Sequence, residues 1–171
     1  MWLPMPPRGT TQQLRGTLDE IKKMIEQLNK SWSWMGIHAE AIIQANEFGN
    51  IIFKTEKGDY WRICPEELSC EKIASTESEL NQSMHNQEFI EDWRMESLVK
   101  LAKSELGDLA EDEKYCLKIP AVIGGTYSKE NLGKINFKEL IAFSGDLAFQ
   151  IKDLPDGQKI KLKIITTPNE S

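Results

Sequence analysis

Apolar residues recur along this chain at two different spacings, and the change between them predicts where helices and strands lie. In the N-terminal part they recur every three or four residues, at Leu14, Leu18, Ile21, Ile25 and Leu28. This spacing predicts an amphipathic helix to about Asn29, with Thr10 or Thr11 at its N-cap. We expect its apolar stripe to pack on the protein's own core. Because residues 31–36 break the pattern, we divide the chain into an N-terminal extension over residues 1–36 and a domain over residues 37–167.

The next part of the chain is rich in β-branched and aromatic residues in short runs, which is typical of strands. Such runs occupy residues 40–43, 51–54, 60–63 and 69–74. The turn between the second and third runs is Glu56-Lys57-Gly58-Asp59, which predicts a hairpin with Gly58 at a positive-φ position. Pro65 ends the third run because proline cannot donate a hydrogen bond to a neighbouring strand.

A helical region follows. Thr76 and Glu79 have the T-x-x-E spacing of a capping box, which predicts a helix start. The pattern breaks near Asn86 and resumes over residues 87–106, with Gly107 as the stop. In this helix three acidic residues fall at i, i+4 and i+8 and so line up on one side: Glu88, Asp92 and Glu96.

The C-terminal third predicts a strand, a glycine corner, a helix, a turn and a last strand. Residues 115–123 form the first strand, with Pro120 making it an edge or a bulge. Asn136 caps a helix to about Asp153, whose expected buried residues are Leu140, Phe143, Leu147, Ile151 and Leu154. Gly145 inside this helix indicates close packing, since glycine costs about 1 kcal/mol there relative to alanine.

The remaining C-terminal residues predict a turn and a strand. Pro155, Asp156 and Gly157 form the turn, and residues 159–165 alternate between apolar and lysine side chains. Taken together, the elements predict an α+β fold in which a small, mostly antiparallel β-sheet packs with several α-helices.

The net charge of the chain limits the classes of macromolecule that it can bind. The chain has a net charge of −6 and a pI near 5.1, which argues against a nucleic-acid-binding surface because such surfaces need clustered lysine and arginine. Residues 66–113 carry 14 acidic and 4 basic residues, a balance of −10. This acidic belt is either a solvated helical surface or a landing surface for a cationic protein.

Residues that support catalysis are few. His38 and His85 lie in no metal-binding motif, and the three cysteines show no C-x-x-C spacing. We therefore expect no catalytic residue, no metal and no cofactor. An enzyme whose site is assembled from scattered residues stays an alternative, and it would need a pocket that holds a histidine beside carboxylates or a cysteine. No apolar run reaches the length of a membrane span or a signal peptide, so we expect a soluble, cytoplasmic protein.

The DYWRICPEEL segment contains another candidate. Trp61 and Arg62 are adjacent in a predicted strand and point to opposite faces. A buried Trp61 therefore places Arg62 in solvent or against Glu66 or Glu67, and the alternative is a contact role for this edge.

Three long strings resemble a known family: YWRICPEELSCEKIA, YCLKIPAVIGG and ELIAFSGDLAFQIKDLPDGQKIKLKI. They resemble the C-terminal domain of bacterial type VI secretion immunity proteins, the partners of DNase effectors, over residues 41–165. The resemblance implies a non-catalytic protein that binds and neutralises a secreted nuclease. A regulatory or housekeeping interaction module without a toxin partner is the alternative.

Two sets of residues complete the predictions. The residues we expect to contact a partner are Glu88, Glu91, Asp92, Glu96, Arg62, Glu66 and Glu67. Those we expect to be structural are Trp61, Gly124, Gly125, Pro155 and Gly157.

Overall fold

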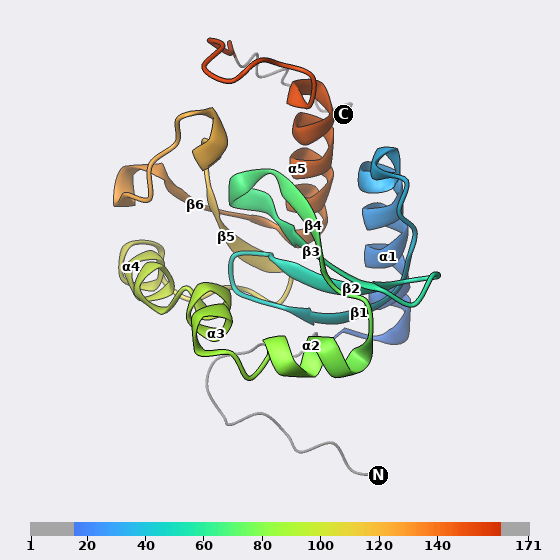
Figure 1. Ribbon diagram of the computed structural model, residues 1–171. Coiled ribbons are helices and arrows are strands. Elements are labelled where there is room, and N and C mark those ends of the chain that lie inside the picture. The colour runs from blue at the N-terminus through green and yellow to red at the C-terminus, as the bar shows by residue number, and fades with distance from the viewer. Residues whose placement is uncertain (1–15, 162–171) are drawn as a thin grey trace, which may run out of the picture.

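A computed structural model describes residues 16–161 and shows an α+β fold (Figure 1). Four antiparallel strands form one sheet in chain order: β1 (Ala39–Ala45), β2 (Ile51–Thr55), β3 (Tyr60–Cys64) and β4 (Ser69–Ala74). A separate antiparallel pair consists of β5 (Glu113–Leu117) and β6 (Leu132–Asn136). The helices are α1 (Leu18–Trp32), α2 (Glu77–Ser83), α3 (Gln87–Arg94), α4 (Glu96–Leu106) and α5 (Phe137–Ile151). Short 3₁₀ turns are η1 (Ser33–Met35), η2 (Pro65–Glu67), η3 (Ala121–Ile123) and η4 (Lys129–Asn131).

Helices cover both faces of the four-stranded sheet. On one face α1 and α5 lie side by side (Figure 1), and Ile51 and Phe53 of β2 join their core. On the other face, Ile52 packs with Leu80 of α2 and Trp93 of α3. Because alternate residues of a strand point to opposite faces, all three residues are fully buried. This explains why β2 begins with an unbroken apolar run.

The β5–β6 pair and α4 form a third core. It gathers Phe48 from the β1–β2 turn with Ala102, Tyr115, Leu117 and Leu132. The rings of Phe48 and Tyr115 lie 5.7 Å apart, and the Tyr115 amide donates to the Glu47 carbonyl over 2.9 Å. The β1–β2 turn is therefore the point where the second sheet is attached to the first.

Several sequence predictions are confirmed. The β2–β3 hairpin turns through Gly58 at φ 88°, and β4 pairs next to β3. Asn136 caps α5, its Oδ1 accepting from the Lys138 amide over 3.0 Å. The Pro155 to Gly157 turn is present, closed by a Gln158 amide to Pro155 carbonyl bond of 3.2 Å.

The start of α1 differs from the prediction. Thr17 is the N-cap and forms a capping box with Glu20, so Leu18 is 80% exposed. The buried face of α1 is centred on Met24, Leu28 and Trp32 and packs against α5, so the helix docks on the protein's own core as expected. Residues Thr10, Thr11 and Leu14 lie outside the described part of the chain.

Two predicted elements are interrupted. The helix expected over residues 87–106 is divided at Met95, which has a positive φ of 47°, into α3 and α4. The strand expected over residues 115–123 ends at Leu117, because Pro120 starts the η3 turn. Strand β6 was not predicted: its sequence, LGKIN, carries only two apolar residues and two glycine or asparagine residues that are rare in strands.

The end of α5 also differs. Phe143 and Leu154 were expected to be buried and are 40% and 38% exposed, and the helix ends at Ile151. Of the strand expected over residues 159–165, residues 159–161 form no strand, and residues 162–165 lie outside the described part.

Gly145 is required where α5 crosses α1. A Cβ placed on Gly145 would lie 2.5 Å from the Ser31 carbonyl oxygen and 2.7 Å from the Ser31 Cβ. Both atoms belong to or adjoin helical backbone, so neither can move aside easily. The close approach that the sequence indicated is confirmed.

We expect Gly145→Ala to lower the free energy of unfolding by about 2 kcal/mol, because the clash at Ser31 outweighs the gain of about 1 kcal/mol in helix propensity. Urea unfolding followed by circular dichroism measures this difference. The control Asp146→Ala changes the neighbouring exposed residue of the same helix and should stay within about 0.5 kcal/mol of the parent. A Gly145→Ala variant at least as stable as the parent would contradict the packing argument.

Candidate partner-binding surface

The acidic residues predicted to line one helix face do not form a continuous stripe. Asp92 and Glu96 lie on different helices, because the chain turns at Met95 between them. Glu96 begins α4 and lies 3.6 Å from Nη1 of Arg94, while Glu91 accepts a 2.7 Å hydrogen bond from Gln87 Nε2. All of these carboxylates are exposed, so they form an acidic surface rather than a stripe.

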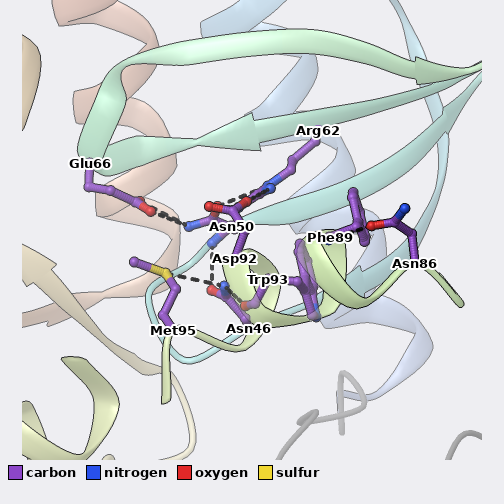
Figure 2. A network of polar contacts seen from close by, with 9 residues as sticks. All are labelled: Asn46, Asn50, Arg62, Glu66, Asn86, Phe89, Asp92, Trp93 and Met95. Carbon is purple, nitrogen blue, oxygen red and sulfur yellow. Dashed lines mark hydrogen bonds and ion pairs between the residues drawn. The ribbon is translucent and has the colours of Figure 1, made fainter. Parts of the chain in front are cut away.

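Arg62 holds α3 against the sheet (Figure 2). Its guanidinium forms an ion pair with Asp92, and its Nε and Nη2 donate to Asn50 Oδ1 over 3.1 and 2.8 Å. The rings of Phe89 and Trp93 lie 5.9 and 5.4 Å from the guanidinium carbon. The Arg62 side chain is only 13% exposed. The sequence predicted Arg62 in solvent or against Glu66 or Glu67, which is wrong: its acidic partner is Asp92.

Glu66 lies inside the protein. Its side chain accepts two hydrogen bonds from Asn50 Nδ2, at 3.0 and 2.9 Å, and the residue is 5% exposed. Burial raises the pKa of the Glu66 carboxyl, and the Asn50 bonds oppose this shift only in part. Because Glu66 is inaccessible, we leave it out of the surface proposed below.

Asn46 fixes the β1–β2 turn, a role that the sequence analysis did not predict. Its Oδ1 accepts from the amides of Phe48 and Asn50, both over 3.0 Å. Its Nδ2 donates over 2.8 Å to the carbonyl of Trp93, the residue beside Asp92 on α3. Figure 2 shows Asn46, Asn50, Arg62 and Glu66 as one connected network between the sheet and α3. Asn-rich turns are common, so only the contact with α3 distinguishes this one.

Glu67 and the β5–β6 loop form a second exposed region. The Tyr127 hydroxyl donates to the Glu67 carboxylate and so joins the loop to η2. Gly124 adopts φ 97°, and a Cβ on Gly125 would lie 1.7 Å from the Ile119 carbonyl oxygen. A side chain would therefore be strained at Gly124 and would clash at Gly125. The exposure of apolar residues in this loop was not predicted, because residues 115–123 were interpreted as a strand.

The thiols are poorly suited to nucleophilic chemistry. Burial raises the pKa of Cys64, of Cys70 to about 12 and of Cys116 to about 11. The thiols therefore stay protonated near neutral pH. Within residues 16–161, no group of three or more histidine, cysteine or acidic residues is placed to hold a metal ion.

One cavity holds a histidine beside carboxylates. It has a volume of about 440 Å³ and is lined by residues 35–38, which lead from η1 to β1, by residues of the β2–β3 turn with Thr55 before it, and by Trp61 of β3. His38 Nδ1 lies 3.1 Å from Glu56 at its wall, but their side chains are 59% and 64% exposed. Asp59, also in the wall, is paired with Lys72 over 3.1 Å. The pair of His38 and Glu56 is therefore exposed to solvent. It lacks the water-excluded environment that favours acid–base catalysis.

No helix among the described residues has the length and apolar content needed to cross a membrane.

Part of the chain matches a family model. Residues 74–148 match the family model described as T6SS immunity protein Tdi1, C-terminal. This agrees with the resemblance found in the sequence, over a shorter span than residues 41–165. A comparison with curated proteins found no match.

Among solved structures, the crystal structure of Atu4351 from Agrobacterium tumefaciens is similar, with 16% sequence identity and a TM-score of 0.48. The similarity covers 75% of this chain and 63% of that one, so this chain spans less than two thirds of that structure.

We expect Asn46→Ala to lower the free energy of unfolding by about 3 kcal/mol, because it leaves the buried Phe48 and Asn50 amides without an acceptor. Urea denaturation monitored by tryptophan fluorescence measures the loss. Asn81→Ala, at an exposed position on α2, is the matched control and should change stability by less than about 0.5 kcal/mol. A loss at Asn46 no larger than at Asn81 would show that the turn holds without this side chain.

The raised pKa of Glu66 predicts a pH dependence of stability. Between the ordinary value of 4.5 and its higher folded value, the folded protein holds this proton and the unfolded chain does not. The parent protein should therefore lose stability relative to Glu66→Gln as the pH rises above about 4.5. Urea unfolding of both proteins from acidic to neutral pH measures the difference. Glu67→Gln controls for the loss of one carboxylate, and a pH-independent difference for Glu66→Gln would contradict the assignment.

Proposed function

We propose that this chain is an immunity protein that binds and neutralises a nuclease-type toxin of a type VI secretion system in the cytoplasm of the producing cell. The observation that supports an immunity role is the family match over residues 74–148. That segment includes α2, α3, α4 and most of α5. It therefore contains the acidic surface described above.

Electrostatics supports a basic partner. A nuclease presents positive potential at its DNA cleft, and an acidic protein is steered to such a cleft and can occlude it. Exposed carboxylates are spread over α2, α3, α4 and the segment before β5: Glu77, Glu79, Glu88, Glu91, Glu96, Glu105, Asp108, Glu111 and Asp112. Ion pairs within the chain occupy Glu96 and Asp108, the latter 2.8 Å from Lys103.

We name the ion pair between Arg62 and Asp92 the Arg62 clamp. It determines which carboxylates of α3 are available to a partner. Asp92 neutralises Arg62, so it is committed to holding α3 on the sheet. Within the described chain, Glu88 and Glu91 make no ion pair, and both are exposed on the same short helix. We therefore assign the first contact with a cationic partner to Glu88 and Glu91, with α3 already fixed in place by Arg62 and Trp93.

The first test is whether a gene beside this one encodes a secreted nuclease, and that nuclease is then the probe. Bacteria that express this nuclease in the cytoplasm should survive only when the chain is co-expressed. Purified chain should also bind an inactivated form of the nuclease and block DNA cleavage by the active form. A gene without such a neighbour, or survival unchanged by the chain, favours the regulatory module instead. Turnover of a substrate by the purified chain alone would favour an enzyme and direct attention to His38 and Glu56.

We expect the double charge reversal Glu88→Lys with Glu91→Lys to weaken binding of the inactivated nuclease by about tenfold or more at low salt. It should also flatten the dependence of the dissociation constant on salt concentration, because fewer charges are screened. Isothermal titration calorimetry at two salt concentrations measures both effects. The matched control, Glu139→Lys with Asp146→Lys, reverses two exposed charges on α5. An equal effect of both double variants would reject α3 as the contact and leave only a net-charge effect.

A further inference from the structure

We propose that the loop between β5 and β6 is a preformed apolar anchor that inserts into a pocket of the toxin, a pocket bordered by a cationic side chain. This inference rests on the proposed function and adds a second contact to the acidic surface. The loop, residues 118–131, carries three large exposed apolar residues, which we name the apolar tip: Ile119 at 45%, Val122 at 54% and Tyr127 at 46% exposure.

The apolar tip places three exposed apolar residues in one loop. Single exposed apolar residues are normal on proteins, but contiguous ones mark interaction sites. Three such residues occur here within one loop, and Phe143 of α5 adds a fourth at 40% exposure. Phe143 and Pro120 line the same small cavity at the base of the loop. Phe143 therefore lies beside the base of the loop.

The loop is held in one conformation by its own polar contacts. Asn131 acts as a clasp: its Oδ1 accepts from the Ile119 amide over 2.9 Å, and its Nδ2 donates to the Ile119 and Thr126 carbonyls over 2.8 and 2.9 Å. The Gly125 amide donates to the Pro120 carbonyl over 3.0 Å, and Pro120 is fully buried. A loop fixed this way loses little conformational entropy when it binds. Its exposed apolar side chains are therefore already in place before a partner binds.

The charge beside the apolar tip indicates the chemistry of the partner. The Glu67 carboxylate is exposed, accepts the Tyr127 hydroxyl, and makes no ion pair within residues 16–161. An apolar pocket that closed over Val122 and Tyr127 would bring this carboxylate out of water, which is unfavourable unless a cation meets it. An arginine or lysine at the rim of the pocket satisfies that requirement. A basic toxin supplies such groups, whereas a second copy of this acidic chain supplies fewer.

This contact differs from the acidic surface in its response to salt. Burial of apolar side chains does not weaken as salt screens charges, whereas the contribution of Glu88 and Glu91 does. The two surfaces can therefore be separated in one titration series. Variants of the apolar tip should lose affinity at every salt concentration, and variants of α3 mainly at low salt.

The probe is the inactivated nuclease used above, and the test variant is Ile119→Ser with Val122→Ser. We expect its dissociation constant to rise by about 30-fold or more at both low and high salt. Tyr127→Phe, which keeps the ring and removes the bond to Glu67, should have a smaller effect. Ile43→Ser and Leu18→Ser, which remove apolar residues of 46% and 80% exposure elsewhere, are matched controls and should stay within about twofold.

A second measurement uses the unmodified chain, so it does not depend on variants that fold. Amide hydrogen exchange of the complex should show protection at residues 118–128, in addition to α3. An affinity of the Ile119 and Val122 double variant within about twofold of the parent, or no protection in the loop, would overturn the inference. It would leave the proposed function standing if the parent still binds and protects cells.

Two further outcomes also decide the matter. If the parent chain does not bind the nuclease at all, the proposed function fails and this inference fails with it. If sedimentation shows that the parent is a dimer and the double variant is a monomer, the apolar tip contacts a second copy of the chain. That result would overturn the assignment to a toxin.

Discussion

Hydrogen bonds made by the two asparagines of the β1–β2 turn join the four-stranded sheet to α3 and to η2. The Asn46 side chain accepts from the Asn50 amide within the turn and donates to the Trp93 carbonyl of α3. The Asn50 side chain accepts a hydrogen bond from Arg62 and donates to the Glu66 carboxylate. Both asparagines are almost fully buried, so each unmade hydrogen bond would be costly. Between them lies Phe48, which belongs to the core of the second sheet. One short turn thus connects the two sheets, α3 and η2.

This network explains how an acidic surface remains ordered. Carboxylates that crowd together on a helix repel one another, and such a helix is weakened when isolated. Here α3 has only two turns and is fixed by Trp93 in the core and by Arg62 below it. Tertiary packing, rather than helix propensity, therefore offsets the repulsion among the remaining carboxylates of α3.

The sequence predicted the elements whose signals are local. The β2–β3 hairpin, the cap at Asn136 and the close packing at Gly145 each follow from residue types within a few positions of one another. The prediction failed where a long-range contact outweighs the local pattern. Met95 divides a helix that apolar spacing alone would continue, and Asn131 pulls residues 118–131 away from an extended path. Nothing near Arg62 in the chain reveals Asp92, which lies 30 residues away.

The sequence predicted that the candidate surface is acidic, but it did not predict which carboxylates are free to contact a partner. The excess of acidic residues correctly indicated α3 and α4 as exposed, but the internal pairing of Asp92 and the burial of Glu66 depend on the fold. The sequence did not predict the apolar tip, because the exposure of a side chain depends on how the chain folds. A run such as IPAVIGG has the composition of a buried strand, and only the early turn at Pro120 brings its side chains to the surface.

The Arg62 clamp has an evolutionary consequence. A protein that must follow a changing toxin can alter only those residues whose loss leaves its own fold intact. Asp92 is tied to Arg62 and cannot drift freely, whereas the side chains of Glu88 and Val122 make no ion pair within residues 16–161. We therefore expect lineages of this protein to diverge in specificity at Glu88 and Val122 while the clamp beneath them stays unchanged.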